Sequence, residues 1–184
     1  LNLMQRMSGI ATMTANAVRE VQKYPVKIVD TRKTIPGLRI LEKYAVRVGG
    51  GCNHRFNLAD GVLIKDNHIA ACGSISEAVK RARAFAPHTI RIEVEVETLD
   101  QLKEALDAKA DIVMLDNMSN EMMAEAVRMV NGSALCEASG NMGEKNLAEV
   151  AATGVDLISI GGLTHSARAM DISLKFQMNT VKGL

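Results

Sequence analysis

Short apolar runs alternate with longer amphipathic segments along most of the chain. Six runs rich in β-branched residues are typical of strands, and the segments between them carry apolar positions three and four residues apart, which is typical of helices. The predicted strands cover residues 26–31, 61–65, 89–96, 111–115, 134–138 and 156–160. The predicted helices cover residues 36–46, 76–86, 99–108, 120–130 and 143–152, after a leading helix over residues 1–24.

The regular order of strand, helix and strand predicts an α/β fold with parallel strands joined by right-handed crossovers. The continuous apolar run from Ile112 to Leu115 is typical of a strand that is buried on both faces. We expect an open or incomplete parallel β/α barrel, similar to a TIM barrel, with six strands and a seventh candidate at residues 172–176. A doubly wound sheet is the alternative fold.

Polar residues or glycines follow almost every predicted strand. In a β/α barrel the carboxyl ends of the strands meet at one mouth, where active sites of such barrels lie. This recurrence favours the barrel over the doubly wound sheet and predicts a site at that mouth. The same pattern would arise more simply if these positions were only solvated loops.

Cationic side chains cluster after the first two predicted strands. Arg32 and Lys33 follow the first strand, His54 and Arg55 follow three consecutive glycines, and Lys65 closes an apolar run. Arginine binds carboxylates in bidentate fashion and histidine adds a further donor, so these residues predict a pocket for a multiply charged anion. Lys65 is also the residue that a Schiff-base aldolase would use.

Carboxylates follow in the middle of the chain. Strict alternation over residues 91–97 places Glu93, Glu95 and Glu97 on one face of a strand, and Asp116 ends the next strand. We expect Glu95 and Asp116 to be neighbours that hold Mg²⁺, directly or through water, or that oppose a developing positive charge. An edge strand with one wet face is the simpler alternative.

The last two predicted strands end in glycine-rich segments. Such ends predict a phosphate cradle built from backbone N–H groups, although tight turns also require glycine. The candidate residues are Ser139, Gly140, Gly161, Gly162 and His165.

Composition excludes several classes of function. The 22 basic and 21 acidic residues leave a net charge of +1, and the chain has no Trp, so neither a basic field nor an aromatic platform for nucleic acid is present. No apolar run is long enough for a membrane helix. Three cysteines without CxxC spacing indicate neither a disulfide framework nor a zinc site. We therefore expect a cytoplasmic protein with a small-molecule substrate.

The motifs together resemble the quinolinate phosphoribosyltransferase family, also called nicotinate-nucleotide pyrophosphorylase (carboxylating). The resemblance runs in order along nearly the whole chain. The matching motifs are Thr31-Arg32-Lys33-Thr34, Pro36-Gly37-Leu38-Arg39, Gly49-Gly50-Gly51, Asn53-His54-Arg55, Leu63-Ile64-Lys65-Asp66-Asn67-His68, Glu93-Val94-Glu95-Val96, Leu115-Asp116-Asn117, Glu137-Ala138-Ser139-Gly140 and Ser159-Ile160-Gly161-Gly162-Leu163-Thr164-His165.

This resemblance implies a transfer of the phosphoribosyl group from phosphoribosyl pyrophosphate to quinolinate, with decarboxylation to nicotinate mononucleotide and with Mg²⁺ as cofactor. It implies that Lys33 faces the phosphates of phosphoribosyl pyrophosphate, together with Lys65. The other implied roles fall into three groups: Arg32, His54, Arg55 and Lys65 for the quinolinate carboxylates, Glu95 and Asp116 for the ribose and metal, and Ser139, Gly140, Gly161, Gly162 and His165 for the 5′-phosphate.

The resemblance also implies a homodimer or higher homo-oligomer. Family members have an N-terminal α/β domain that supplies a further arginine to the partner's site, and we expect that this chain starts after that domain and has little activity alone. Three alternatives remain open at this point. They are a molybdenum-operon relative with another acid acceptor, a Schiff-base aldolase that uses Lys65, and a barrel that binds phosphate or assembles without catalysis.

Overall fold

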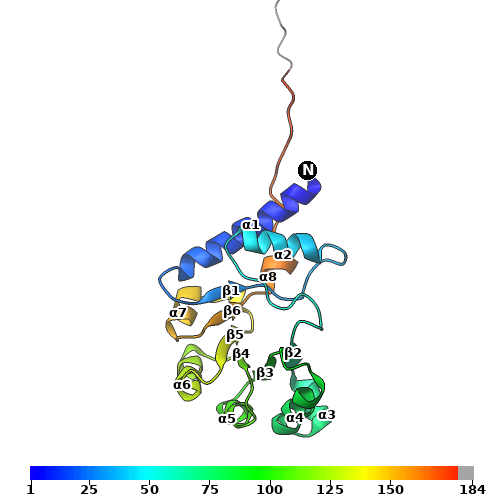
Figure 1. Cartoon of the computed structure of the whole chain (residues 1–184). Coiled ribbons are helices and arrows are strands. Elements are labelled where there is room, and N and C mark those ends of the chain that lie inside the picture. Colours follow the sequence, from blue (N-terminus) through cyan, green and yellow to red (C-terminus); the bar gives the residue numbers. More distant parts are fainter. Residues whose placement is uncertain (178–184) are drawn as a thin grey trace, which may run out of the picture.

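Six parallel strands form a single curved sheet at the centre of the molecule (Figure 1). The computed structural model describes residues 1–177 of the 184. The sheet order is β1-β6-β5-β4-β3-β2, and every pairing is parallel. The strands are β1 (Lys27–Val29), β2 (Val62–Ile64), β3 (Ile92–Val96), β4 (Ile112–Asp116), β5 (Leu135–Ser139) and β6 (Leu157–Ser159).

The strand order decides between the two predicted folds. From β2 to β6 each strand lies beside the next one along the chain, whereas a doubly wound sheet reverses direction at a switch point. The expected open barrel is therefore confirmed, and the doubly wound alternative is wrong. Within residues 1–177, β1 and β2 form no ladder with each other, and only an isolated bridge between Val29 and Cys52 extends the sheet beyond β1.

Helices cover the outside of this sheet. The predicted helix at 120–130 matches α6 at both ends, and α4 and α5 agree to within one residue. Ser74, Thr98 and Ser119 fix the start of α4, α5 and α6 by accepting a hydrogen bond from a backbone N–H of the first turn. The helices are α1 (Asn2–Val21), α2 (Arg39–Val48), α3 (Asp66–Cys72), α4 (Ile75–Phe85), α5 (Leu99–Asp107), α6 (Asn120–Val130), α7 (Leu147–Ala152) and α8 (Gly162–His165).

Two predicted helices begin later than expected, and two short helices were not predicted. Pro36 does not start α2, because Gly37 adopts a φ of 79° and residues 36–38 form a turn before Arg39. The helix predicted from residue 143 is divided into a 3₁₀ turn (Met142–Glu144) and α7, which Asn146 caps. The short helices α3 and α8 directly follow β2 and β6 in the sequence, where we had predicted only loops.

The seventh strand expected at residues 172–176 is wrong. These residues have no regular structure and extend away from the sheet, beyond α1 (Figure 1). Gln5 of α1 donates its side-chain amide to the carbonyl of Ile172, and Met170 donates its backbone N–H to Gln5. The segment therefore follows a helix and does not reach a free sheet edge, and its Phe176 side chain is 88% exposed.

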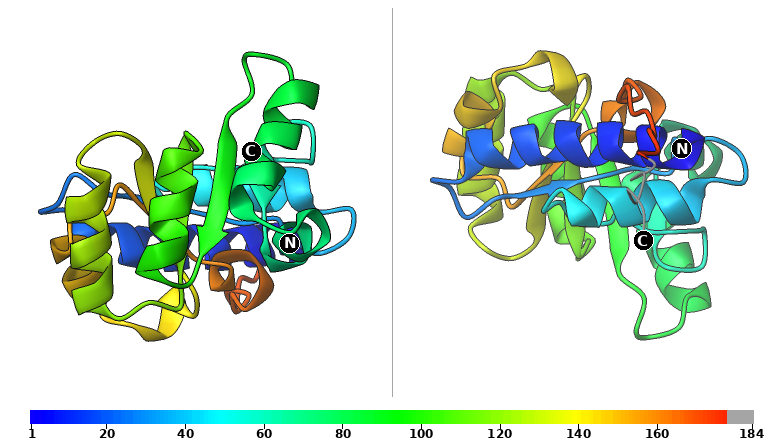
Figure 2. Two further views of the ribbon diagram at one scale, coloured as in Figure 1. Left: turned by 90° about the horizontal axis from the view of Figure 1, so that it is seen from below. Right: turned by 90° about the horizontal axis from the view of Figure 1, so that it is seen from above.

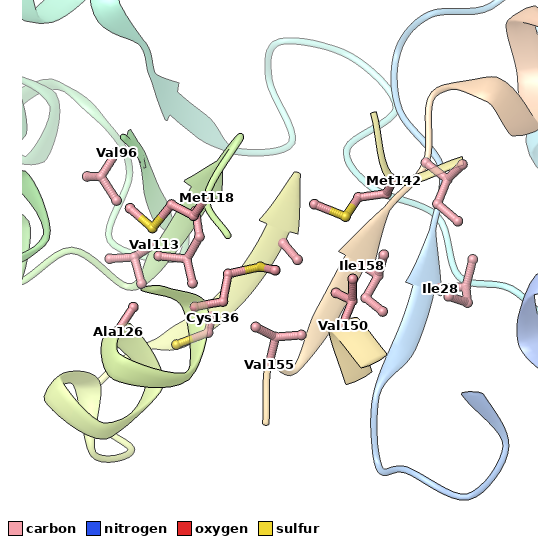
Figure 3. Packing of buried hydrophobic residues seen from close by; sticks show 14 of the residues in the cluster. Ile28, Val96, Val113, Met118, Ala126, Cys136, Met142, Val150, Val155 and Ile158 are labelled. Carbon is pink, nitrogen blue, oxygen red and sulfur yellow. The ribbon is translucent and has the colours of Figure 1, made fainter. Parts of the chain in front are cut away.

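The apolar core lies between the outer face of the sheet and the helices, as Figure 3 shows for part of it. Alternate strand residues such as Val113, Cys136 and Ile158 point to this layer and are at most 2% exposed. The long helix α1 runs beside α2 on the β1 side of the barrel (Figure 2). Among the described residues, no helix combines the length and apolar character needed to cross a membrane.

Candidate active site

The larger of two adjoining hollows at the carboxyl ends of the strands collects most of the predicted site residues. It has a volume of about 460 Å³ and is strongly polar. It contains both predicted carboxylates and all of the predicted phosphate cradle, which come from four different strands and their following loops. The predicted residues that line it are Lys33, Lys65, Glu95, Asp116, Ser139, Gly140, Gly161, Gly162 and His165.

The second hollow lies in the barrel lumen and has a volume of about 320 Å³. Thr31, Lys33, Lys65, Ser139 and Ser159 line both hollows, so the two form one connected site. The structure thus brings together every residue that the sequence predicted for the site. The predicted cations of this second hollow are Arg32, Lys33, His54, Arg55 and Lys65.

Two arginines face this second hollow without a carboxylate partner. Among residues 1–177, neither Arg32 nor Arg55 forms an ion pair, and the side-chain Nε of Arg32 is buried without a hydrogen-bond acceptor. Burial and then the positive charge of Arg32 lower the pKa of Arg55. Two guanidinium groups held close together in this way are suited to an incoming anion with more than one negative charge.

Lys65 and Glu95 form an ion pair at the junction of the two hollows. The Nζ atom of Lys65 lies 2.6 Å from Oε2 of Glu95. Asp116 and Glu95 line the same hollow, but they are not register partners as expected, since Glu95 pairs with Met114 and Asp116 pairs with Ser139. The strands are staggered, so residues at the same mouth come from different levels of the ladder.

The carboxylates of Glu95 and Asp116 have the oxygen chemistry that Mg²⁺ prefers. Asp116 already accepts a hydrogen bond of 2.8 Å from the side chain of Asn117, and Glu95 is engaged by Lys65. Both residues still offer carboxylate oxygens to one polar hollow, so the residues present fit a hard divalent cation. Lys65 would then share Glu95 with the metal.

A buried network holds the loop that carries His54 and Arg55. Asp30 is fully buried at the end of β1, and its carboxylate lies 2.6 Å from Nζ of Lys43 on α2. The same carboxylate accepts the side-chain amide of Asn53 and the backbone N–H of His54, while Lys43 also donates to the carbonyl of His54. Because every partner is hydrogen-bonded, this charged pair can fix the loop despite its burial.

The late loops owe their shape to positive φ angles. Gly140 has a φ of 92°, and a side chain there would collide with the side chain and backbone nitrogen of Asn117. Asn117 and Asn141 themselves have φ angles of 54° and 51°, a region that asparagine tolerates better than most residues. Thr164 Oγ1 donates to the carbonyl of Lys33 at 2.7 Å, which ties the loop after β6 to the loop after β1.

Two lumenal glutamates were not among the predicted site residues. Glu93 and Glu137 are 4% and 1% exposed, and their Oε2 atoms lie 3.2 and 3.5 Å from Nε2 of His54. The signal for both is present in the sequence, because a charged residue inside an otherwise apolar buried strand needs a partner. The expectation that Glu97 shares their face fails, since it follows the last residue of β3 and is exposed.

These three residues offer ligand atoms within 4.8 Å of one another, the spacing of a metal site. The hydrogen bonding of the His54 imidazole argues against metal binding. The backbone N–H of Arg55 donates to His54 Nδ1 at 2.8 Å, so the ring proton of a neutral His54 resides on Nε2. A nitrogen that carries a proton cannot bind a metal ion, and Nε2 instead faces the two glutamates.

Comparison with known proteins identifies the family of the chain. Residues 10–175 match the model of the quinolinate phosphoribosyl transferase C-terminal domain. The chain belongs to this family. The resemblance seen in the sequence motifs is therefore confirmed, and it covers all of the site residues described above.

The relatives are named for the carboxylating enzyme. The chain is 55% identical over 174 residues to the probable nicotinate-nucleotide pyrophosphorylase [carboxylating] of Bacillus subtilis, with 95% of this chain and 60% of the relative covered. It is 49% identical over 177 residues to the nicotinate-nucleotide pyrophosphorylase [carboxylating] of Mycobacterium leprae, covering 95% of this chain and 62% of that relative. The chain thus spans about 60% of the length of these curated relatives.

A solved structure agrees with the fold. The crystal structure of NadC from Streptococcus pyogenes superposes with a TM-score of 0.89 at 49% identity, and covers 96% of this chain and 62% of that protein. The agreement extends over the six strands and the helices around them, so the open barrel is shared within the family.

Proposed function

We propose that this chain forms the barrel in which a phosphoribosyl group passes from phosphoribosyl pyrophosphate to quinolinate, with loss of CO₂ and formation of nicotinate mononucleotide and pyrophosphate. Family membership and the names of the relatives support this reaction. The observation that carries it is the pair of guanidinium groups at Arg32 and Arg55, which face a lumenal hollow and lack carboxylate partners among residues 1–177.

Quinolinate carries two adjacent carboxylates, and the lumenal hollow supplies the matching cations. In the proposed complex Arg32 and Arg55 bind these carboxylates, and Lys65 contributes from the junction with the outer hollow. His54 joins them only if its Nε2 turns from the glutamates to the ligand, because both ring nitrogens are engaged within the protein. Its part in the clamp therefore requires a change of side-chain orientation.

The outer hollow accommodates the second substrate. Lys33 faces the phosphates of phosphoribosyl pyrophosphate, and Lys65 lies within reach of the same hollow. The carboxylates of Glu95 and Asp116 lie beside the ribose, where the reacting carbon becomes positive as pyrophosphate leaves. The 5′-phosphate is held on the late loops by Ser139, Gly140, Gly161, Gly162 and His165.

Mg²⁺ is the proposed cofactor, and Glu95 and Asp116 would hold it. When bound, it would neutralise the charge that develops on the departing pyrophosphate. The chain's own residues divide the remaining work, since the cations bind the anionic substrates and the carboxylates stabilise the cationic ribose centre.

The proposed active form is a cytoplasmic homodimer or higher homo-oligomer. Ile40, Tyr44 and Val48 lie at successive turns of α2 and are between 59% and 70% exposed. Such a row of apolar side chains on one helix face is typical of a surface that another protein covers. Sedimentation velocity of the purified protein measures the oligomeric state directly.

Calorimetric titration tests the substrate assignment. Quinolinate, nicotinate and phosphoribosyl pyrophosphate are titrated separately, with and without Mg²⁺, into the wild type, Arg55→Ala and Arg47→Ala. Arg47 is an exposed arginine on α2 away from both hollows and serves as the matched control. We expect quinolinate binding to be lost only in Arg55→Ala. A preference of the wild type for nicotinate would overturn the assignment.

A further inference from the structure

Glu137 occupies a position in the lumen that the proposed binding roles do not use. It lies in the middle of β5 and is 1% exposed, beside Glu93 of β3 and His54 of the loop before β2. Lys65 at the end of β2 and Ser159 of β6 also face it. Two carboxylates and one imidazole thus share a space that is almost closed to solvent.

The Nε2 atom of His54 lies 3.2 Å from a carboxylate oxygen of Glu93 and 3.5 Å from one of Glu137. Because the backbone N–H of Arg55 donates to His54 Nδ1, only Nε2 of the neutral ring can donate to Glu93 and Glu137. Oε1 of each glutamate is buried and has no hydrogen-bond partner within residues 1–177. Two ionised carboxylates this close together and this dry are strongly unfavourable, so one of them retains a proton.

The proton belongs to Glu137. Burial and then the negative charge of Glu93 raise the pKa of Glu137 to about 7, against the opposing effects of His54, Ser159 and Lys65. The same acidic neighbours raise the pKa of His54, although burial opposes this. The hydrogen bond that Nδ1 accepts from Arg55 is formed by the neutral ring, so protonation of His54 would break it.

Glu137 can be reached from two sides. It lines the lumenal hollow that holds Arg32 and Arg55, and it also lines a separate hollow of about 660 Å³ at the amino ends of the strands. Lys27 and Arg91 lie at that opposite end. A ligand at the carboxyl-end mouth therefore leaves the hollow behind Glu137 open.

The proposed reaction needs an acid at this place. Once the ring nitrogen of quinolinate carries the ribose, the bond between C2 and its carboxylate can break, which releases CO₂ and leaves the electron pair on C2. That carbon must gain a proton. A guanidinium does not release a proton near neutral pH, and neutral His54 holds its proton on Nε2. The ammonium group of Lys65 is engaged by Glu95 at 2.6 Å, which leaves Glu137 as the acid of this hollow that is not paired with a cation.

We propose that Glu137 is the catalytic acid that protonates C2 as CO₂ departs, so that cleavage of the C2–carboxylate bond and proton transfer occur in one step. The O–H proton of Glu137 passes to C2, the new C–H bond uses the electron pair left by the carboxylate, and Glu137 becomes ionised. Water in the hollow at the amino ends of the strands returns the proton. Glu93 acts as a positioning residue, because its charge keeps Glu137 protonated in the resting state. This inference rests on the proposed phosphoribosyl transfer to quinolinate.

The test separates the two halves of the reaction in single turnovers with Mg²⁺, quinolinate and phosphoribosyl pyrophosphate. Pyrophosphate release reports the transfer, and CO₂ release reports the decarboxylation. Glu137→Gln keeps the shape of the side chain and removes the acid. We expect it to slow CO₂ release on the order of 100-fold more than pyrophosphate release, since general acids contribute on this scale.

The pH profile distinguishes an acid from a residue that only supports the fold. The rate of CO₂ release by the wild type should fall as pH rises through the pKa of Glu137. This falling limb of the pH profile should be absent in Glu137→Gln. Glu93→Gln should move the limb to lower pH, because it removes the charge that raises that pKa. If Glu137→Gln does not fold, the shift in Glu93→Gln decides the question.

The possible failures are distinguishable. If the protein encoded by the complete gene releases no pyrophosphate from these substrates, both the proposed function and this inference are overturned. Normal pyrophosphate release with unchanged CO₂ release and an unchanged pH limb in Glu137→Gln would overturn only the role of Glu137. An unmoved limb in Glu93→Gln would do the same.

Discussion

At the scale of single residues, some charged side chains of the site have ion-pair partners and others do not. Lys65 is paired with Glu95 and Lys43 with Asp30, whereas Arg32 and Arg55 lack such partners among residues 1–177. The Lys43–Asp30 pair holds the loop of His54 and Arg55 in place, whereas the unpaired guanidinium groups face the hollow. Lys65 combines the two, since it is paired with Glu95 and also faces both hollows.

Glu137 gives a prediction about stability. Its pKa is raised from 4.5 to about 7 in the folded protein, so the unfolded chain releases this proton at lower pH than the folded protein does. The contribution of Glu137 to the free energy of unfolding is thus most favourable below pH 4.5. It falls by on the order of 3 kcal/mol as pH rises to about 7. We expect Glu137→Gln to flatten this dependence.

Urea unfolding of both proteins across this pH range measures the effect. His54 also has a raised pKa and loses its contribution in the same direction. The difference between wild type and variant isolates Glu137. Curves of unfolding free energy against pH that run parallel in the two proteins would contradict the prediction.

At the scale of elements, the packing of α1 against the end of α2 leaves no room for a side chain. Gly49 has an ordinary φ of −74°, yet a β-carbon there would collide with the backbone carbonyl of Ala11 and would lie 2.7 Å from Cβ of Thr14. The obstacle is steric and involves backbone, which cannot yield locally. The contact between the two helices therefore depends on this glycine.

Gly49→Ala is expected to destabilise the fold by about 1–3 kcal/mol, because one helix must shift to accommodate the methyl group. Gly143→Ala is the matched control, since a β-carbon there would make only an ordinary contact of 3.6 Å with Ile160. Thermal unfolding of the two variants compares them. Equal losses would show that helix packing is not the cause.

The helices and strands show how much of the fold can be predicted from the sequence alone. Amphipathic helices with serine or threonine caps were predicted to within one residue at α4, α5 and α6, because periodicity and caps are local signals. The start of α2 was missed, since the turn at Gly37 competes with the helical preference of Pro36 for a first turn. No strand formed at residues 172–176, because this segment follows α1 and does not reach a free edge of the sheet.

The site residues likewise include some that the sequence predicted and some that it did not. Residues that directly follow a strand, such as Arg32, Lys65 and Asp116, were predicted because barrel topology places all strand ends at one mouth. Glu93 and Glu137 were not assigned, because their importance depends on the stagger between strands that brings them both to His54. The sequence marks each glutamate as a charge within a buried strand, but the stagger that brings the two to one histidine is a property of the whole sheet.

At the scale of the whole molecule, Arg6 joins three segments that are distant in sequence. Its guanidinium pairs with Glu42 of α2 at 2.9 Å and donates to the carbonyls of Thr164 and Ala167. Glu42 is fully buried and also accepts the backbone N–H of Ile35. The first helix is thereby tied to the loops after β1 and β6, which frame the proposed phosphate site.

Arg6→Ala is expected to cost about 3–5 kcal/mol of unfolding free energy, since it leaves the Glu42 carboxylate buried without its counter-charge. The double variant Arg6→Met with Glu42→Leu should recover much of that loss, because the uncompensated charge is then absent. Arg128→Ala, which breaks an exposed pair with Glu125, is the control and should cost at most about 1 kcal/mol. Chemical denaturation measures all three. A double variant as unstable as Arg6→Ala would refute this account.

The strand order also has a consequence for how the chain folds during synthesis. Lys27 of β1 pairs with Leu157 of β6, so the first strand of the sheet finds its ladder only when β6 has been made. The strands from β2 to β6 can meanwhile assemble one after another, because each needs only its predecessor. Until β6 has been made, the backbone groups of β1 lack their ladder partners, which leaves this edge open to non-native pairing.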